Sequence, residues 1–190
     1  MKKHLLFKLR YKQFDYSNKI TKFTIELQNR YEEESIMKYV CTLIAVKNIE
    51  LSKKFYHDIL DQEVIADLGA NVTLTGGFAL QRSDTWGNFI HKSQDKIIYG
   101  NNDAGLYFEE DDMDAFIQKL SNFNVEYVHP LKEHSWGQRV VRFYDLDKHI
   151  IEVGENMAIV AKRFINSGMT VEQTAMRMHV HIDYIKSLLI

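Results

Sequence analysis

Residues 43–56 read LIAVKNIELSKKFY, and this stretch decides the fold. It opens with residues that favour β-strands, and every fourth residue from Leu51 to Ile59 is apolar, which is the spacing of one helix face. Asn48 stands between the two patterns and is a residue type that caps helices. We therefore predict a strand over residues 39–46, followed directly by a helix.

Three short strands are predicted after this helix, over residues 64–67, 71–75 and 78–81. Gly69 and the pair Gly76-Gly77 separate them, and glycine suits the tight turns of antiparallel strands. The unit is βαβββ.

The same order returns about 64 residues later, which indicates an internal repeat. A strand over 105–110 precedes a helix with one apolar face, and further strands follow over 125–128, 138–144 and 150–153. Each unit has one helix, which covers one face of its sheet. We predict an α+β fold of two tandem βαβββ modules that form a curved mixed sheet, with the uncovered faces lining a cleft for a small ligand.

The chain divides by composition into three parts. Residues 1–36 form a basic N-terminal extension, with eight Lys and Arg against five Asp and Glu, and residues 37–154 hold the two modules. Residues 155–190 are predicted to form a helical C-terminal tail, with Thr170 starting a capping box. We expect this tail to cover a sheet edge or a second subunit. A DNA-binding helix-turn-helix is the alternative, although the tail has little net charge.

Composition excludes several functional classes. Hydrophobic residues make up 45% of the chain, only one residue is proline, and the formal net charge is −2. These values exclude wholesale disorder and make nucleic acid an unlikely partner. No apolar run is long enough to cross a membrane, so we predict a cytoplasmic protein. Cys41 is the single cysteine, which excludes intrachain disulfides and cysteine-based zinc clusters.

The densest group of functional side chains lies in residues 129–139, HPLKEHSWGQR. Trp136 offers a large contact surface, and Arg139 can bind a carboxylate or phosphate with two parallel hydrogen bonds. His134 titrates near neutral pH and can act as an acid or a base. We predict a ligand-binding loop, with hairpin packing as the alternative.

Two stretches resemble the vicinal oxygen chelate superfamily, which includes glyoxalases, extradiol dioxygenases and bleomycin- and fosfomycin-resistance proteins. The opening strand and helix end in Ser52-x-x-Phe55-Tyr56, and residues 141–153, VRFYDLDKHIIEV, resemble the last hairpin of the family. Leu146 and Lys148 replace the usual proline and glycine of that hairpin turn. The resemblance covers about residues 39–154 and implies the same fold.

The resemblance also implies a divalent metal held by one residue from each of four strands. The corresponding positions here are Cys41, Gln81, Gly105 and Glu152. Only Glu152 is a standard ligand of the family, Gln81 is a possible second one, and glycine supplies no side-chain donor. We therefore expect either no cofactor or one divalent metal bound through Glu152 and Gln81. Without a metal, Glu152 is a general base, a ligand-binding carboxylate or the partner of Arg139 or Arg142.

The same alignment places Tyr107 on the cleft side of its strand, where its hydroxyl can orient a ligand. Trp86 lies in the segment that joins the modules and is a candidate lid. Our main functional prediction is a small-molecule-binding protein of the glyoxalase/bleomycin-resistance type, a homodimer without a complete metal site. The alternatives are a glyoxalase-like metal-dependent lyase or isomerase with Glu152 as its catalytic residue, and a ligand-responsive regulator that uses the tail.

Overall fold

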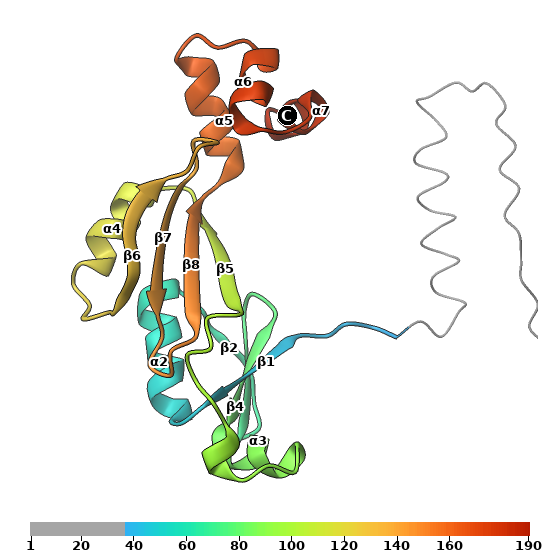
Figure 1. Cartoon of the computed structure of the whole chain (residues 1–190), viewed down its shortest axis with the longest axis vertical. Helices are drawn as coiled ribbons and strands as arrows, with labels where there is room; N and C mark the ends of the chain where they lie inside the picture. The colour runs from blue at the N-terminus through green and yellow to red at the C-terminus, as the bar shows by residue number, and fades with distance from the viewer. Residues whose placement is uncertain (1–36) are drawn as a thin grey trace, which may run out of the picture. The chain divides into compact units, whose positions relative to one another are not determined.

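The first module begins with a strand that leads into a capped helix, as predicted. The structure is a computed structural model that describes residues 37–190 (Figure 1). The side chain of Asn48 accepts a hydrogen bond of 3.1 Å from the backbone nitrogen of Leu51 and so caps helix α2. The elements are β1 (Thr42–Val46), α2 (Ile49–Leu60), β2 (Val64–Asp67), β3 (Asn71–Leu74) and β4 (Phe78–Arg82). Their strands pair in the order β1-β4-β3-β2, with β1 parallel to β4.

The second module repeats this arrangement. Helix α3 (Ser83–Phe89) and the 3-10 turn η1 (Gln94–Lys96) lead into β5 (Gly105–Glu110), α4 (Met113–Leu120), β6 (Tyr127–Glu133), β7 (Arg139–Tyr144) and β8 (Ile150–Glu155). The sheet order is β5-β8-β7-β6, and β5 runs parallel to β8. The equivalent strand order in the two sheets confirms the predicted α+β fold of tandem βαβββ modules.

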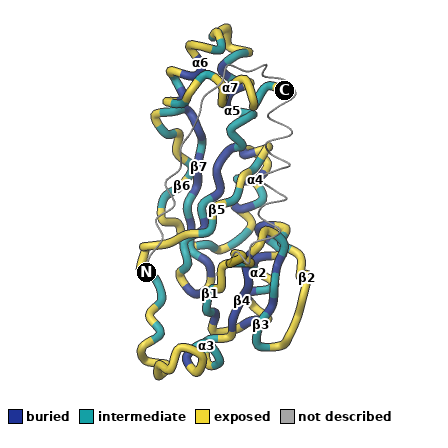
Figure 2. Tube along the Cα trace, turned by 90° about the vertical axis from the view of Figure 1, so that its right-hand side faces the viewer, coloured by how far each residue is buried: buried dark blue, intermediate teal, exposed yellow. Residues whose placement is uncertain are grey.

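One hydrophobic core joins the two modules. It contains residues from both helices and from β3, β4, β7 and β8, among them Tyr56, Leu74, Met113 and Phe143, all fully buried. The rings of Phe55 and Phe143 lie 6.5 Å apart, so α2 packs against the second sheet as well as its own. By contrast, β2 is exposed along its whole length (Figure 2).

The strand and loop boundaries of residues 125–139 differ from the prediction. Strand β6 runs through Pro130 to Glu133, where we expected a binding loop from residue 129 onward. Proline cannot donate a backbone hydrogen bond, but β6 is an edge strand and its pairing with β7 shifts register on both sides of His129. His129 is therefore a strand residue, and only residues 134–138 form the turn between β6 and β7.

The tail forms three helices with a hydrophobic core of their own. They are α5 (Met157–Asn166), α6 (Val171–Met178) and α7 (Ile182–Leu188), and the predicted capping box of Thr170 is present at the start of α6. Figure 1 shows them gathered at one end of the β5–β8 sheet. The predicted N-terminal extension, residues 1–36, lies outside the described residues. Within residues 37–190 the structure has no helix with the length and apolar character needed to span a membrane.

Candidate functional site

The candidate site lies on the face of the β5–β8 sheet that points away from the core. Residues of alternating parity point to opposite faces of a strand. Phe108, Phe143 and Val153 pack into the core, so Tyr107, Arg142 and Glu152 lie on the opposite face, which we call the open face. Tyr107, Glu152 and Arg142 are paired side by side across the neighbouring strands β5, β8 and β7.

Arg142 is at the centre of the open face. It lies directly opposite Glu152 in the pairing of β7 with β8, and its Nε donates to Glu152 Oε2 over 2.6 Å. Its Nη1 lies 2.8 Å from His129 Nε2 and 3.5 Å from His134 Nε2. Because a guanidinium group only donates hydrogen bonds, each imidazole accepts at Nε2 and is uncharged in this arrangement.

His134 and Trp136 present a stacked pair beside Arg142. Their ring centroids are 4.3 Å apart with an interplanar angle of 7°. Partial burial and the nearby positive charges of Arg142 and Lys132 hold the pKa of His134 below its usual range. The pair therefore offers an uncharged, flat surface at neutral pH, next to a cationic group.

Tyr107 and Gln138 extend the polar network across Gly154. Gln138 Nε2 donates to the Tyr107 hydroxyl over 2.9 Å, and its Oε1 accepts from Trp136 Nε1 over 3.2 Å. A Cβ on Gly154 would lie 2.7 Å from Gln138 Nε2 and 3.0 Å from the Tyr107 ring, so only glycine allows this approach. Burial of the hydroxyl raises the pKa of Tyr107 to about 12, although the residue as a whole is half exposed. The hydroxyl thus remains protonated and donates to Glu109 Oε1 over 3.1 Å.

These contacts bring together four of the residues predicted from the sequence, namely Tyr107, His134, Trp136 and Glu152. The name Arg142 cluster is used below for the following set: Tyr107, His129, His134, Trp136, Gln138, Arg142 and Glu152. Sequence reasoning considered Arg142 only as a possible partner of Glu152 and did not assign His129 or Gln138.

The remaining predicted residues lie elsewhere. Arg139 points to the other face of β7, where it binds Glu155 of β8 and Asp114 of α4 at 3.1 and 2.8 Å. Trp86 lies half-buried in α3, which follows β4 in the first module. The ligand-binding roles assigned to these two residues stay predictions, and the Arg142 cluster does not include them.

The positions implied by the metal-binding resemblance do not fit a divalent metal. Gln81 is buried, and its amide is used by the side chains of Asn71 and Thr85 and the carbonyl of Ala70. Gly105 has no side-chain donor, and Glu152 is bound by Arg142. Across residues 37–190 there is no group of three or more His, Cys, Asp or Glu side chains placed to hold a metal ion. Arg142 Nε lies 2.6 Å from Glu152 Oε2 at this position.

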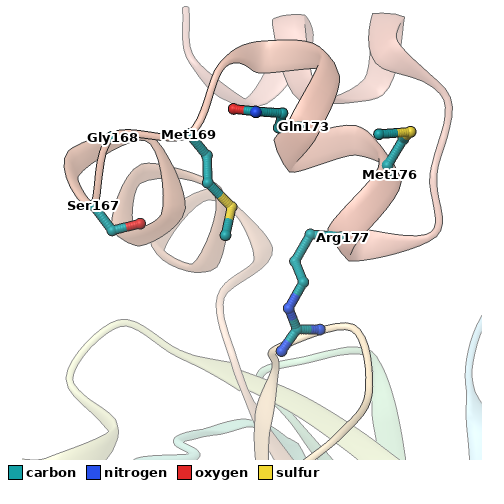
Figure 3. A pocket seen from close by; sticks show the side chains of 6 residues that line it. All are labelled: Ser167, Gly168, Met169, Gln173, Met176 and Arg177. Carbon is teal, nitrogen blue, oxygen red and sulfur yellow. The ribbon is translucent and has the colours of Figure 1, made fainter.

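A surface pocket of about 590 Å³ lies in the tail, away from the sheet (Figure 3). It is bordered by the turn between α5 and α6 and by one side of α6, with Met169, Gln173 and Met176 among its lining residues. Arg177 borders the same pocket and extends toward the β6–β7 turn. Its Nη1 donates to the carbonyl oxygen of Ser135 and so joins α6 to that turn.

Comparison with known protein families matches residues 39–158 to the glyoxalase-like domain. The chain belongs to the glyoxalase-like family. This places it in the vicinal oxygen chelate superfamily, as the two sequence stretches indicated. A search of curated proteins found no match.

Solved structures agree with the family assignment. A protein of unknown function from Agrobacterium tumefaciens is 38% identical, with a TM-score of 0.60, and the match covers 66% of this chain and 98% of that one. A glyoxalase/bleomycin resistance protein/dioxygenase from Nocardioides has 14% identity and a TM-score of 0.51 over 70% and 92% of the two chains. A family enzyme from Burkholderia phytofirmans has 12% identity and a TM-score of 0.54 over 61% and 96%. The last two show the fold alone.

Proposed function

We propose that this glyoxalase-like protein binds a small planar anion on the open face of the β5–β8 sheet, without a metal. The observation that carries the proposal is the position of Arg142, between Glu152 and the His134–Trp136 stack. A guanidinium group has five N–H donors. Nε and Nη1 of Arg142 are used by Glu152 and the two histidines, and among the described residues Nη2 has no hydrogen-bond partner. A carboxylate of the ligand can accept a hydrogen bond from Nη2 while the planar ring of the ligand packs on Trp136.

A simple aromatic carboxylate tests this proposal. In a Trp86→Phe background Trp136 is the only tryptophan, so its indole N–H gives a single NMR signal. We expect benzoate to shift this signal in a saturable way, and benzamide, which has the same ring without the charge, to bind more weakly. Arg142→Gln should abolish the benzoate response. Arg82→Gln is the matched control, because Arg82 is an exposed arginine paired with Asp84 in the first module.

Two outcomes would count against the proposal. If benzoate leaves the Trp136 signal unchanged up to high millimolar concentration, the open face does not bind planar anions. If Arg142→Gln and Arg82→Gln weaken binding equally, Arg142 does not provide the charge that recognises the carboxylate.

The metal-dependent lyase or isomerase is tested separately by elemental analysis. The protein is incubated with nickel, zinc, manganese and iron, and the metal-to-protein ratio is compared with that of Glu152→Ala. We expect neither form to retain a stoichiometric metal, because Glu152 is engaged by Arg142 and Gln81 by its neighbours. A bound metal that disappears in Glu152→Ala would favour the enzyme.

The regulator with a DNA-binding tail receives less support from the charges of the tail. Arg163 and Arg177 turn toward the sheet and bind carbonyl and carboxylate groups there. Lys162 and Lys186 are then balanced by Glu172 and Asp183, which leaves no concentrated positive surface for a phosphate backbone. We propose a homodimeric cytoplasmic binding protein instead, and sedimentation equilibrium checks the dimer.

A further inference from the structure

The turn between β6 and β7 is held by two arginines of the tail. Arg163 of α5 donates from Nη2 to the carbonyl oxygen of Gly137 over 2.6 Å. Arg177 of α6 donates from Nη1 to the carbonyl oxygen of Ser135, and Figure 3 shows its side chain extending from α6 toward this turn. Two backbone groups of a five-residue turn are therefore fixed by the tail helices.

Phe164 adds an apolar contact to the same turn. A Cβ on Gly137 would lie 2.2 Å from the Phe164 ring, so the ring rests directly on the glycine backbone. Gly137 also has a φ of +89°, a conformation that residues with side chains rarely adopt. The guanidinium groups of Arg163 and Arg177 lie 5.3 and 5.1 Å from the centre of the Phe164 ring. Phe164 thus packs against both arginines and the turn.

A buried carboxylate fixes Arg163 at the base of the tail. Glu155, the last residue of β8, is 1% exposed, and its Oε2 accepts from Arg163 Nη2 over 2.9 Å. Its Oε1 accepts from Arg139 Nη2 over 3.1 Å. Because an unpaired buried carboxylate is costly, this arrangement holds Arg163 in place beneath the turn.

The other residues of the same turn carry the Arg142 cluster. The carbonyls of Ser135 and Gly137 are bound by the tail, while the side chains of the alternate residues His134, Trp136 and Gln138 belong to the open face. The contacts with the tail and the contacts on the open face are therefore made by the same five consecutive residues, 134–138. A shift of the tail therefore moves the backbone that positions the His134–Trp136 stack.

We propose that Arg163 and Arg177 are positioning residues for the ligand site, and that the helical tail sets the geometry of the His134–Trp136 stack through the β6–β7 turn. This inference rests on the proposed function only in treating the stack as the ligand surface. Its consequence is that changes in the tail, at residues that touch no ligand, alter the site on the open face.

Trp136 fluorescence measured against pH tests the proposal without a ligand. In the Trp86→Phe background all tryptophan emission comes from Trp136, and a protonated imidazole stacked on an indole quenches its fluorescence. The quenching midpoint reports the pKa of His134, and the amplitude reports the stack. We compare Arg163→Gln and Arg177→Gln with Lys162→Gln, which removes the same charge from an exposed neighbouring position of α5.

We expect both arginine variants to lose most of the quenching amplitude and to shift the midpoint upward, toward the ordinary histidine value of about 6.5, because His134 moves into solvent. Lys162→Gln should reproduce the background profile. Gly137→Ala keeps both arginines but forces Phe164 away from the turn, so it should resemble the arginine variants. Far-UV circular dichroism establishes that each variant is folded.

The result that overturns the proposal is a folded Arg177→Gln protein with the fluorescence profile of the background. Arg177 is used for this decision because it is partly exposed and is not part of the buried Glu155 group. We therefore expect Arg177→Gln to fold even if Arg163→Gln does not. The benzoate titration separates the two hypotheses. An altered stack in the arginine variants, together with no benzoate binding by the background protein, contradicts only the proposed function. Normal benzoate binding by the background protein, together with an unaltered stack in both arginine variants, contradicts only the role of the tail.

Discussion

Arg142 affects the pKa of His134 across the open face. The positive charge of Arg142 is one cause of the lowered His134 pKa, after partial burial. We predict that Arg142→Gln raises the pKa of His134 while leaving it below the ordinary value, since the burial remains. Titration of the His134 ring proton by NMR measures the change, and Arg82→Gln serves as the control. An unchanged His134 pKa in Arg142→Gln would show that the charge of Arg142 does not contribute to the shift.

The lowered pKa of His134 also makes stability depend on pH. Below about pH 6.5 the unfolded chain binds a proton at His134 before the folded chain does. The contribution of this residue to the free energy of unfolding is therefore present above that pH and is lost as the pH falls toward the folded pKa. We predict that His134→Gln removes part of the stability loss between pH 7 and pH 5. Urea unfolding at both pH values tests this, and equal losses in the two proteins would contradict it.

The Arg142–Glu152 pair shows how much of the site could be predicted from the sequence. The turn 145–149 places Tyr144 opposite Ile150, and counting back along both strands places Arg142 opposite Glu152. This pairing was within reach of the sequence. His129 was not, because its position depends on the irregular register of β6 around Pro130. The face of Arg139 was within reach as well, because it lies three residues before Arg142 on the predicted strand 138–144 and therefore points to the opposite face.

At the level of elements, the sequence predicted helix starts correctly but did not predict contacts between residues far apart in the chain. Asn48 and Thr170 predicted the starts of α2 and α6, because a helix cap involves residues only a few positions apart. The contacts of Arg163 with Gly137 and of Arg177 with Ser135 join residues 26 and 42 positions apart. No spacing rule in the sequence indicates such contacts.

The junction between β8 and α5 depends on Glu155. We predict that Glu155→Gln lowers the free energy of unfolding by about 3 kcal/mol, because it removes the charge that Arg139 and Arg163 share in a buried position. Glu126→Gln is the matched control, since its ion pair with Lys148 is exposed and its loss should cost less than about 1 kcal/mol. Urea unfolding measures both. Equal effects of the two substitutions would show that the buried group does not stabilise the junction.

At the scale of the whole domain, a polar connection supplements the shared hydrophobic core. The hydroxyl of Tyr56 on α2 donates to Asp145 Oδ2 over 2.8 Å, and the backbone nitrogen of Lys47 after β1 donates to Asp147 Oδ2 over 2.9 Å. Both aspartates belong to the turn between β7 and β8 and are buried. The hairpin turn that marks the family in the sequence is thus also where the second module binds the first.

Tyr56→Phe tests this connection between the modules. The substitution removes a buried hydrogen bond to a carboxylate and leaves the ring in the core, so we expect a loss of about 2 kcal/mol in the free energy of unfolding. Tyr144→Phe is the control, because its hydroxyl donates to the exposed Asn102. Urea unfolding followed by circular dichroism should show a large effect only for Tyr56→Phe. If the two variants are equally stable, the hydrogen bond between Tyr56 and Asp145 does not help to hold the modules together.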